Sequence, residues 1–197
     1  MKKIILASGS PRRKELLAQI GLEFEVIVSD AEEVMTSTYP GEVVKELSGC
    51  KAMAVTLTLN EDQKDAVVIG ADTVVAQDDR ILGKPKDEED AFQMLHMLQG
   101  QTHQVYTGVT LISGEKKVSF YEKSDVSVYP MTDDEIWEYI HTGEPMDKAG
   151  AYAIQGGCVI YIKEIRGEYS NVVGLPVARL YQELSRMESN EQSADSE

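Results

Sequence analysis

The chain has 197 residues, 42% of them hydrophobic, and a formal net charge of −15 at pH 7. This length predicts one domain, or one domain with two lobes, and the apolar content is enough for a full core. The acidic balance argues against general binding to nucleic acids or anionic membranes, which needs a basic surface. No apolar run approaches the roughly 20 residues that span a bilayer, so we expect no membrane partner.

The cysteines and the N-terminus bear on where the protein works. Cys50 and Cys158 are far apart and lack the spacing of a metal site, so we interpret them as buried thiols in a reducing compartment. Lys2 and Lys3 precede a short apolar run as in a signal peptide, but the segment GSPRRK breaks that run. These features predict a cytoplasmic protein.

The first half of the chain predicts alternating strands and helices. Ser10 and Pro11 favour a helix start, and Gly21 favours its end. The segment AVVIGADTVVAQ is continuous and β-branched, as in a central strand, and RILG is a short partner for a hairpin. The expected elements are strands over 4–8, 24–30, 66–77 and 80–83, and helices over 11–21 and 41–59.

The second half predicts antiparallel strands between helices. Thr132 and Glu135 form the pattern of a capping box at a helix start. The expected elements are helices over 87–100, 132–143 and 176–187, and strands over 105–113, 117–129 and 158–165. The whole pattern predicts an α/β protein with a mixed sheet. We expect one domain over 1–186 and a disordered acidic tail over 187–197, because the end is polar and lacks aromatic residues.

Three basic residues lie where a helix favours negative charge. Arg12, Arg13 and Lys14 fall in the first turn of the helix that starts at Pro11. The helix dipole disfavours cations there, by roughly 0.3–1 kcal/mol for each charge. One explanation is that an anion such as a phosphate binds at this end. The alternative is that the long side chains simply reach solvent.

Asp72 interrupts the apolar strand over 66–77, beside Gly70 and Ala71. A carboxylate at such a place is costly unless it is paired, hydrogen-bonded or bound to a metal. It could be a structural aspartate that caps a turn. It could also be a general base or a magnesium ligand.

Other acidic and basic residues are weaker candidates. Glu32 or Glu33 of SDAEE could supply another oxygen ligand for a metal, although acidic loops are usually only solvated. Lys51, Lys84 and Lys86 could bind phosphate oxygens, although each by itself reads as a surface lysine.

The segment DKAGAYAIQGG, residues 147–157, could let a ligand approach the backbone closely. Its Gln155 could read the edge of a base, or the segment could be a tight loop without a ligand. The histidines lack metal-binding spacing, and we interpret them as ordinary; they are His96, His103 and His141. No P-loop, dinucleotide-binding glycine motif or nucleophile elbow is present in the sequence.

Several of these segments together resemble the Maf-like nucleoside triphosphate pyrophosphatases, from about residue 4 to 184. The resemblance implies hydrolysis of a nucleoside triphosphate to the monophosphate and pyrophosphate, with Mg²⁺ or Mn²⁺. It also implies an elongated, two-lobed, inosine-triphosphatase-like fold with a central cleft, and a homodimer. The segments, in chain order, are LASGSPRRKELL, GADTVV, LGKPKD, a TGV strand, EPMDKAGAYAIQG and SNVVGLP.

The same resemblance implies roles for individual residues. Asp72 would be the proton acceptor, and Asp72 with Glu32 would hold the metal. The residues DKAGAYAIQG and SNVVGLP resemble the branch that acts on dTTP and UTP, and other members of the family are linked to arrest of septum formation. The positions implied to set substrate choice are Arg12, Thr73 and Gln155, and those implied to bind the substrate are Ser8, Arg13, Lys51 and Lys84.

Two other functions stay open. One is a regulator of cell division that senses a nucleotide without hydrolysing it, although a sensor would not need Asp72 beside its phosphate-binding groups. The other is a phosphatase that releases inorganic phosphate, against which only the resemblance argues.

Overall fold

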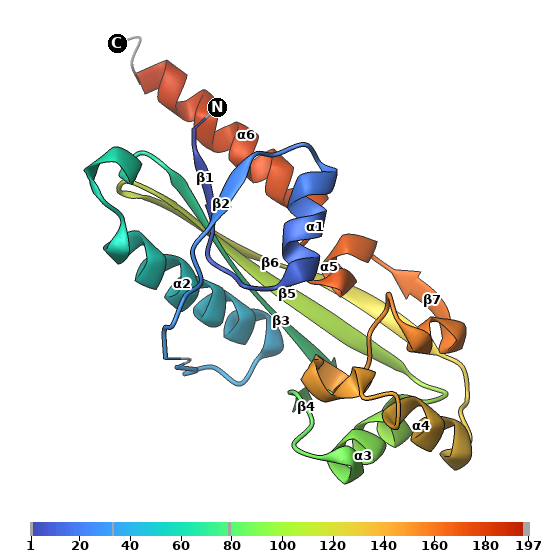
Figure 1. Ribbon diagram of the computed structural model, residues 1–197. Helices are drawn as coiled ribbons and strands as arrows, with labels where there is room; N and C mark the ends of the chain where they lie inside the picture. Colours follow the sequence, from blue (N-terminus) through green and yellow to red (C-terminus); the bar gives the residue numbers. More distant parts are fainter. Residues whose placement is uncertain (1, 33, 79, 195–197) are drawn as a thin grey trace.

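The computed structural model describes residues 2–32, 34–78 and 80–194. Within these ranges seven strands form one sheet, with helices on both faces (Figure 1). The strands are β1 (Ile4–Leu6), β2 (Phe24–Val26), β3 (Val67–Gln77), β4 (Arg80–Leu82), β5 (Thr102–Ser113), β6 (Lys116–Val128) and β7 (Ile162–Arg166). The α-helices are α1 (Pro11–Gln19), α2 (Pro40–Thr58), α3 (Glu88–Leu98), α4 (Asp133–Ile140), α5 (Tyr169–Val173) and α6 (Val177–Ala194). The 3-10 helices are η1 (Glu61–Gln63), η2 (Glu144–Asp147), η3 (Ala149–Ala151) and η4 (Gly157–Tyr161).

The sheet is mixed, as the sequence predicts. Its strand order is β2-β1-β3-β5-β6-β7, and β4 pairs with β3. β1 runs parallel to β2 and β3, whereas the pairs β3–β4, β3–β5, β5–β6 and β6–β7 are antiparallel. The parallel pairs belong to the early helix–strand alternation, and the antiparallel pairs to the later hairpins.

The molecule is elongated and has two lobes joined by the long strands (Figure 1). One lobe carries α1, α2 and α6, and the other carries α3, α4 and η2–η4. Helices α2 and α5 lie on opposite faces of the sheet, because Gly108 of β5 faces α2 while the neighbouring Thr107 donates a hydrogen bond to the Asn171 carbonyl oxygen of α5. The α/β class and the two-lobed shape are therefore confirmed.

Two glycines let α2 lie directly on the sheet. A Cβ atom added at Gly70 of β3 would lie 2.2 Å from the Ser48 carbonyl oxygen. One added at Gly108 of β5 would lie 2.2 Å from the Val44 carbonyl oxygen. Any side chain at these positions would therefore push the helix away, and their absence brings the residues of α2 close to the centre of β3.

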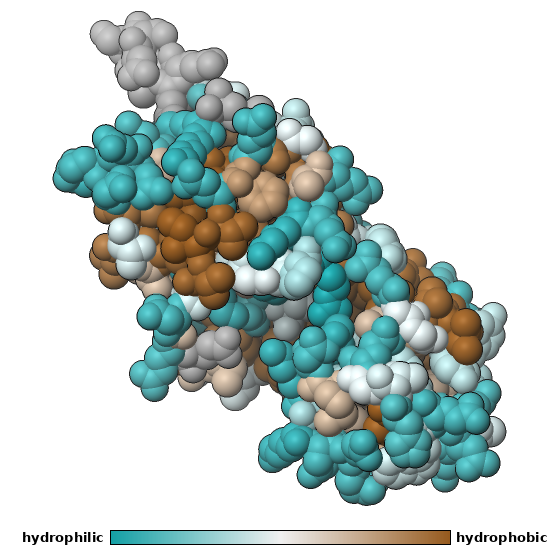
Figure 2. Space-filling model, in the orientation of Figure 1, coloured by the Kyte–Doolittle hydropathy of each residue, from teal (hydrophilic) through white to brown (hydrophobic). Residues whose placement is uncertain are grey.

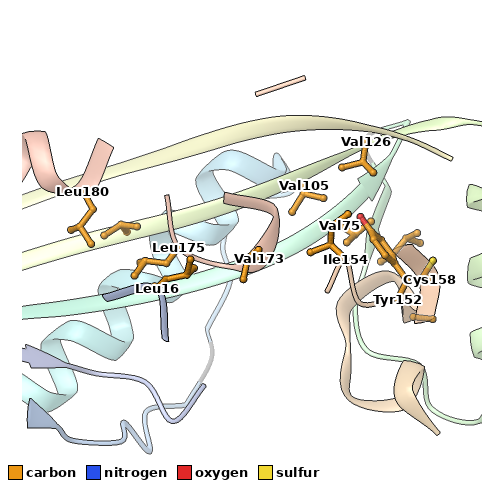
Figure 3. Close-up of a cluster of buried hydrophobic side chains, with 14 of the residues drawn as sticks. Leu16, Val75, Val105, Val126, Tyr152, Ile154, Cys158, Val173, Leu175 and Leu180 are labelled. Carbon is orange, nitrogen blue, oxygen red and sulfur yellow. The ribbon is translucent and has the colours of Figure 1, made fainter. Parts of the chain in front are cut away.

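The main core cluster runs through both lobes. Figure 3 shows part of it, with Leu16, Leu175 and Leu180 toward one end and Tyr152, Ile154 and Cys158 toward the other. The face shown in Figure 2 is mostly hydrophilic, and its apolar patches lie near β2 and over η4, where Val28 and Ile160 are 65% and 73% exposed. Cys158 is buried and Cys50 half-buried, and neither forms a disulfide.

Most predicted elements are present, including the capping box of α4. There the Thr132 hydroxyl accepts a hydrogen bond from the Glu135 N–H, and the Glu135 carboxylate accepts one from the Thr132 N–H. The helix start at Pro11 is also confirmed, but the Ser10 side chain makes no capping hydrogen bond. Instead the Ser10 N–H donates to the Ser8 hydroxyl, 3.3 Å away.

Three predicted strands are shorter than expected by two or more residues, and the first of them, predicted over 4–8, ends at Leu6. The strand predicted over 24–30 ends at Val26, and the strand predicted over 158–165 begins at Ile162. The continuous apolar run after Gly157 suggested a strand, but a carboxylate oxygen of Glu144 accepts a hydrogen bond from the Gly157 N–H at 2.9 Å. This contact holds the chain in a 3-10 helix in place of a strand. The local apolar pattern gives no sign of such a contact.

The C-terminal end bears on the predicted tail. Helix α6 continues to Ala194, within the segment 187–197 that was expected to be disordered, and residues 195–197 lie outside the described residues. The division into a domain and a disordered tail stays a prediction. In the described part of the chain, none of the helices combines the length and the apolar character that crossing a bilayer requires.

Candidate active site

A cleft of about 690 Å³ lies between the two lobes. Its walls come from the start of α1, the middle of α2 and β3, the turn after β4, the segment η2–η3 and the end of α5. Two acidic side chains line it, Asp72 and Asp147. Five basic side chains line it too, namely Arg12, Arg13, Lys51, Lys84 and Lys148. The cleft is thus locally positive in a chain of net charge −15.

The cleft opens where β3 loses its neighbouring strand. β1 pairs with β3 only up to Ile69, and β4 pairs with it only from Val75. Between these points, residues 70–74 have no strand partner on this edge among the described residues. Alternate residues of a strand direct their backbone N–H and C=O groups to the same edge. The backbone groups of Thr73 therefore face this gap, and Thr73 lines the cleft.

Asp72 and Lys51 form an ion pair inside the cleft. Their side chains are only 14% and 19% exposed, so the pair is largely removed from solvent. Lys51 reaches Asp72 because α2 lies against Gly108, the residue that faces Asp72 on β5. The lysine compensates the cost of burying a carboxylate, which answers why an aspartate can interrupt this apolar strand.

Thr73 points to the other face of β3 and is held by Arg13. One guanidinium nitrogen of Arg13 donates to the Thr73 hydroxyl and another to the Ser8 hydroxyl, each at 3.1 Å. The third donates to the Gly174 carbonyl oxygen at 2.8 Å. Thr73 also shares a hydrogen bond of 2.9 Å with Thr107. The cleft therefore wraps around the edge of β3 and takes polar groups from both faces of the sheet.

These contacts explain part of the basic cluster at the start of α1. Burial lowers the pKa of Arg13, and the nearby Asp72 opposes that shift. Arg13 is thus both a structural tie between β1, β3 and α5 and a positive group at the cleft. Its guanidinium has five N–H donors, and the three contacts leave donors for a ligand. Arg12 lines the cleft beside it and also acts on Asp147 across the cleft.

The second lobe contributes Lys84 after β4 and the pair Asp147–Lys148 at the end of η2. A hydrogen bond from Lys148 lowers the pKa of Asp147, and the positive charge of Arg12 lowers it further. Lys148 was not among the predicted site residues. Its signal was present in the DKAG segment, but a lysine in a loop looks like any surface lysine until its side chain is seen to be largely buried.

The other wall of the cleft is apolar. Val75 of β3 and Val105 of β5 line it, together with Tyr152 and Ile154 from the segment after η3 and Val173 from α5. Figure 3 shows Val75, Tyr152 and Ile154 converging from these different elements. The cleft can therefore receive a molecule with an anionic part and an uncharged, flat part.

Most of the predicted site residues come together at the cleft. Those that line it are Ser8, Arg12, Arg13, Lys51, Asp72, Thr73 and Lys84. Glu32 is exposed in the loop after β2, and Gln155 is exposed after Ile154; neither is among the described residues that line the cleft. Lys86 does not line it either, and Glu33 lies outside the described residues. The proposed roles of Glu32 and Gln155 stay predictions.

A divalent cation fits this site only together with phosphate. Among the described residues there is no cluster of three or more His, Cys, Asp or Glu side chains that could hold a metal. Asp72 offers one carboxylate inside the cleft. Mg²⁺ commonly binds through one or two carboxylates, several waters and the phosphates of a substrate. The donor set therefore fits a cation carried on phosphates and bound through Asp72.

Known proteins with similar sequences extend over almost the whole chain. A protein of Agathobacter rectalis named dTTP/UTP pyrophosphatase is 57% identical, over 95% of this chain and 98% of its own length. A protein of Bacillus cytotoxicus with the same name is 52% identical, over 96% of this chain and 97% of its own length. The solved structure of a nucleoside-triphosphatase / dITP/XTP pyrophosphatase from Mycobacterium abscessus is 15% identical, with a TM-score of 0.40 over 66% of this chain and 75% of that chain.

A family model agrees with these relatives. The model described as Maf-like protein matches residues 3–187, which include both lobes and every residue that lines the cleft. The match extends from the start of β1 into α6. This chain belongs to the Maf-like protein family.

Proposed function

We propose that this protein hydrolyses dTTP and UTP to the nucleoside monophosphate and pyrophosphate. The observation that carries the proposal is Asp72, a carboxylate held in a cleft with five basic side chains. A triphosphate is the kind of anion that needs so many cations, and hydrolysis needs a group that can accept a proton. The names of the relatives at 57% and 52% identity support the choice of dTTP and UTP.

In the proposed reaction Asp72 accepts a proton from a water molecule in the cleft. The oxygen of that water forms a bond to the α-phosphorus, and the bond from the α-phosphorus to the bridging oxygen breaks. The bridging oxygen keeps the electron pair and leaves with pyrophosphate. Basic side chains from both lobes, such as Arg12 and Lys148, offset the charge on the leaving group.

We propose that a divalent cation, Mg²⁺ or Mn²⁺, accompanies the substrate. Asp72 would hold it together with the phosphates, and Glu32 would join only if the loop after β2 brought it to the cleft. A bound cation neutralises phosphate oxygens and makes water more acidic. Lys51 fixes the orientation of the Asp72 carboxylate from the side of α2.

The remaining expectations rest on the composition of the chain or on the resemblance. We propose that the protein acts in the cytoplasm, which agrees with the free thiols of Cys50 and Cys158. A homodimer, the lack of nucleic-acid partners and a link to septum formation stay predictions.

Product analysis tests the proposed function. The protein would be incubated separately with dTTP, UTP, CTP and GTP, with Mg²⁺ or Mn²⁺, and the products separated by anion-exchange chromatography. We expect monophosphate and pyrophosphate from dTTP and UTP and little product from GTP. Diphosphate and inorganic phosphate would instead assign the protein to the phosphatases. Binding without any turnover would favour a nucleotide-sensing regulator.

A further inference from the structure

His103 is a buried polar residue that the proposed reaction does not use. It lies on β5, and its exposed fraction is 0%. Its Nε2 atom is 2.8 Å from the Tyr152 hydroxyl, and the two rings meet edge to face with their centres 5.3 Å apart. Its Nδ1 atom is buried with no hydrogen-bond partner among the described residues.

A polar ring at this position needs a reason. A buried donor or acceptor without a partner costs free energy, so a phenylalanine would fill the same space without the stranded Nδ1. Burial lowers the pKa of His103 to about 4, so the ring is neutral near pH 7 and makes no ion pair there. Among the described residues its side chain makes one hydrogen bond, to Tyr152, and this contact distinguishes it from an apolar residue.

Tyr152 begins a short strip of chain, Tyr152–Ile154, that forms part of the cleft wall. Tyr152 and Ile154 line the cleft on its apolar side. Two hydrogen bonds anchor the strip: the Tyr152 hydroxyl contacts His103, and the Ala153 N–H donates to the Tyr139 hydroxyl at 3.1 Å. The chain before the strip is constrained as well, because Gly150 and Ala151 both adopt positive φ, of 68° and 58°.

The packing at Gly150 leaves little freedom for this strip. A Cβ atom added there would lie 2.9 Å from a methyl group of Val75, which lines the same apolar wall of the cleft as Tyr152. Positive φ at Ala151 is strained for a residue with a Cβ atom, and such strain persists only where the surroundings hold it. The contact between His103 and the hydroxyl of Tyr152, the residue after Ala151, is part of those surroundings.

We propose that His103 is a positioning residue for substrate selection, which acts through Tyr152 to fix the strip Tyr152–Ile154 against the nucleobase. The inference rests on the proposed function. It places the triphosphate among the basic side chains and the uncharged base against the apolar wall. His103 touches neither the substrate nor the reacting atoms, so its effect is on the choice and affinity of the base and not on the chemical step.

The test compares three variants with the wild type. His103→Phe removes the hydrogen bond and keeps a ring, His103→Gln keeps a polar group, and Tyr152→Phe removes only the hydroxyl. The matched control is Thr110→Val, which breaks the buried 2.9 Å contact between Thr110 and Ser48 away from the cleft. For each protein, kcat and KM are measured with UTP and with GTP.

We expect His103→Phe and Tyr152→Phe to raise KM for UTP by about threefold to tenfold, the effect of one lost hydrogen bond. The ratio of kcat/KM for UTP to that for GTP should fall by a similar factor, while kcat changes less. His103→Gln should restore part of the ratio, and Thr110→Val should leave it unchanged. An unchanged ratio in both Phe variants would overturn the inference.

Failure of the proposed function gives a different result. If the wild type hydrolyses neither nucleotide, that function fails, and the same variants are compared by the Kd of UTP and GTP in calorimetry. A changed ratio of the two Kd values would support the inference, and an unchanged ratio would overturn it. If His103→Phe does not fold, Tyr152→Phe decides the outcome.

Discussion

The two walls of the cleft are built in different ways. Asp72 stands on β3, an eleven-residue strand that pairs with β5 along most of its length. The wall from the second lobe comes from residues 147–154, which lie in the segment 143–161, where three 3-10 helices follow one another. In that segment Gly143, Gly150 and Ala151 have positive φ, whereas no described residue of β3 does.

The difference in backbone structure between the two walls matches the role proposed for each wall. A group that accepts a proton must stay in one place, and a strand inside a sheet holds it through many hydrogen bonds. A wall that selects a base must have a particular shape, and a chain of tight turns can be shaped by a few contacts such as those of Tyr152. The comparison predicts that substitutions in β3 lower the rate of hydrolysis, whereas substitutions in the turn segment change the preference between nucleotides.

The largest expected effect is the loss of the Asp72 carboxylate. Asp72→Asn keeps the shape of the side chain and removes the proton acceptor, so hydrolysis of UTP should fall by about 10²–10⁴. Nucleotide binding should persist, because the basic side chains of the cleft remain. The measurement is kcat by product formation, with Kd by calorimetry.

The matched control is Asp125→Asn on β6. Asp125 is also a strand aspartate beside a lysine, with Lys123 at 3.3 Å, but it does not line the cleft. It should keep wild-type hydrolysis. Wild-type activity in Asp72→Asn would refute the assignment of Asp72 as the base, and an equal loss in both variants would attribute the effect to the sheet as a whole.

The next effect is on the sheet that carries Asp72. In Gly108→Ala the new Cβ would overlap the Val44 carbonyl oxygen, 2.2 Å away, so α2 has to move. We expect a loss of about 3 kcal/mol in the free energy of unfolding, at the upper end for an overpacked contact. Because α2 also carries Lys51, activity should fall together with stability. Urea unfolding and kcat measure the two effects.

A different glycine, which lies on α2 itself, provides the control. A Cβ added at Gly49 has its nearest neighbour at 3.7 Å, which is an ordinary contact. Gly49→Ala should therefore be neutral, or stabilise the protein by up to about 1 kcal/mol through better helix propensity. A similar loss in both glycine variants would mean that α2 does not depend on close contact with β5.

The same contrast separates what could be predicted from the sequence. Asp72 was found because a carboxylate in a continuous apolar strand is visible within a few residues. Arg12 and Arg13 were found because their place at the helix start is also local. The strands β3, β5 and β6 and the capped helix α4 follow from local periodicity in the same way.

The turn segment could not be predicted in this way. The side chain of Lys148 is largely buried, although it lies in a loop, and His103 depends on Tyr152, which lies 49 residues later. The strand expected over 158–165 begins only at Ile162, because the Gly157 N–H donates a hydrogen bond to the carboxylate of Glu144. The contacts of His103 and Gly157 join residues that are distant in the sequence, which no local pattern records.

The smallest of the three expected effects concerns His103, which lies buried behind Tyr152. Burial lowers its pKa to about 4, from an ordinary value of 6.5. Above pH 6.5 the ring is neutral in both the folded and unfolded chain, so it adds no pH dependence. Between pH 6.5 and about 4 the unfolded chain takes up a proton that the folded chain does not, so stability falls as the pH falls.

At pH 5 this contribution amounts to about 2 kcal/mol of lost stability relative to pH 7. His103→Gln has no ring to protonate, so its loss between pH 7 and pH 5 should be smaller than that of the wild type by this amount. Urea unfolding at the two pH values measures the difference, and the shared contribution of other groups cancels. Equal losses in both proteins would mean that His103 takes up its proton while the chain is folded, and would contradict the lowered pKa of the buried ring.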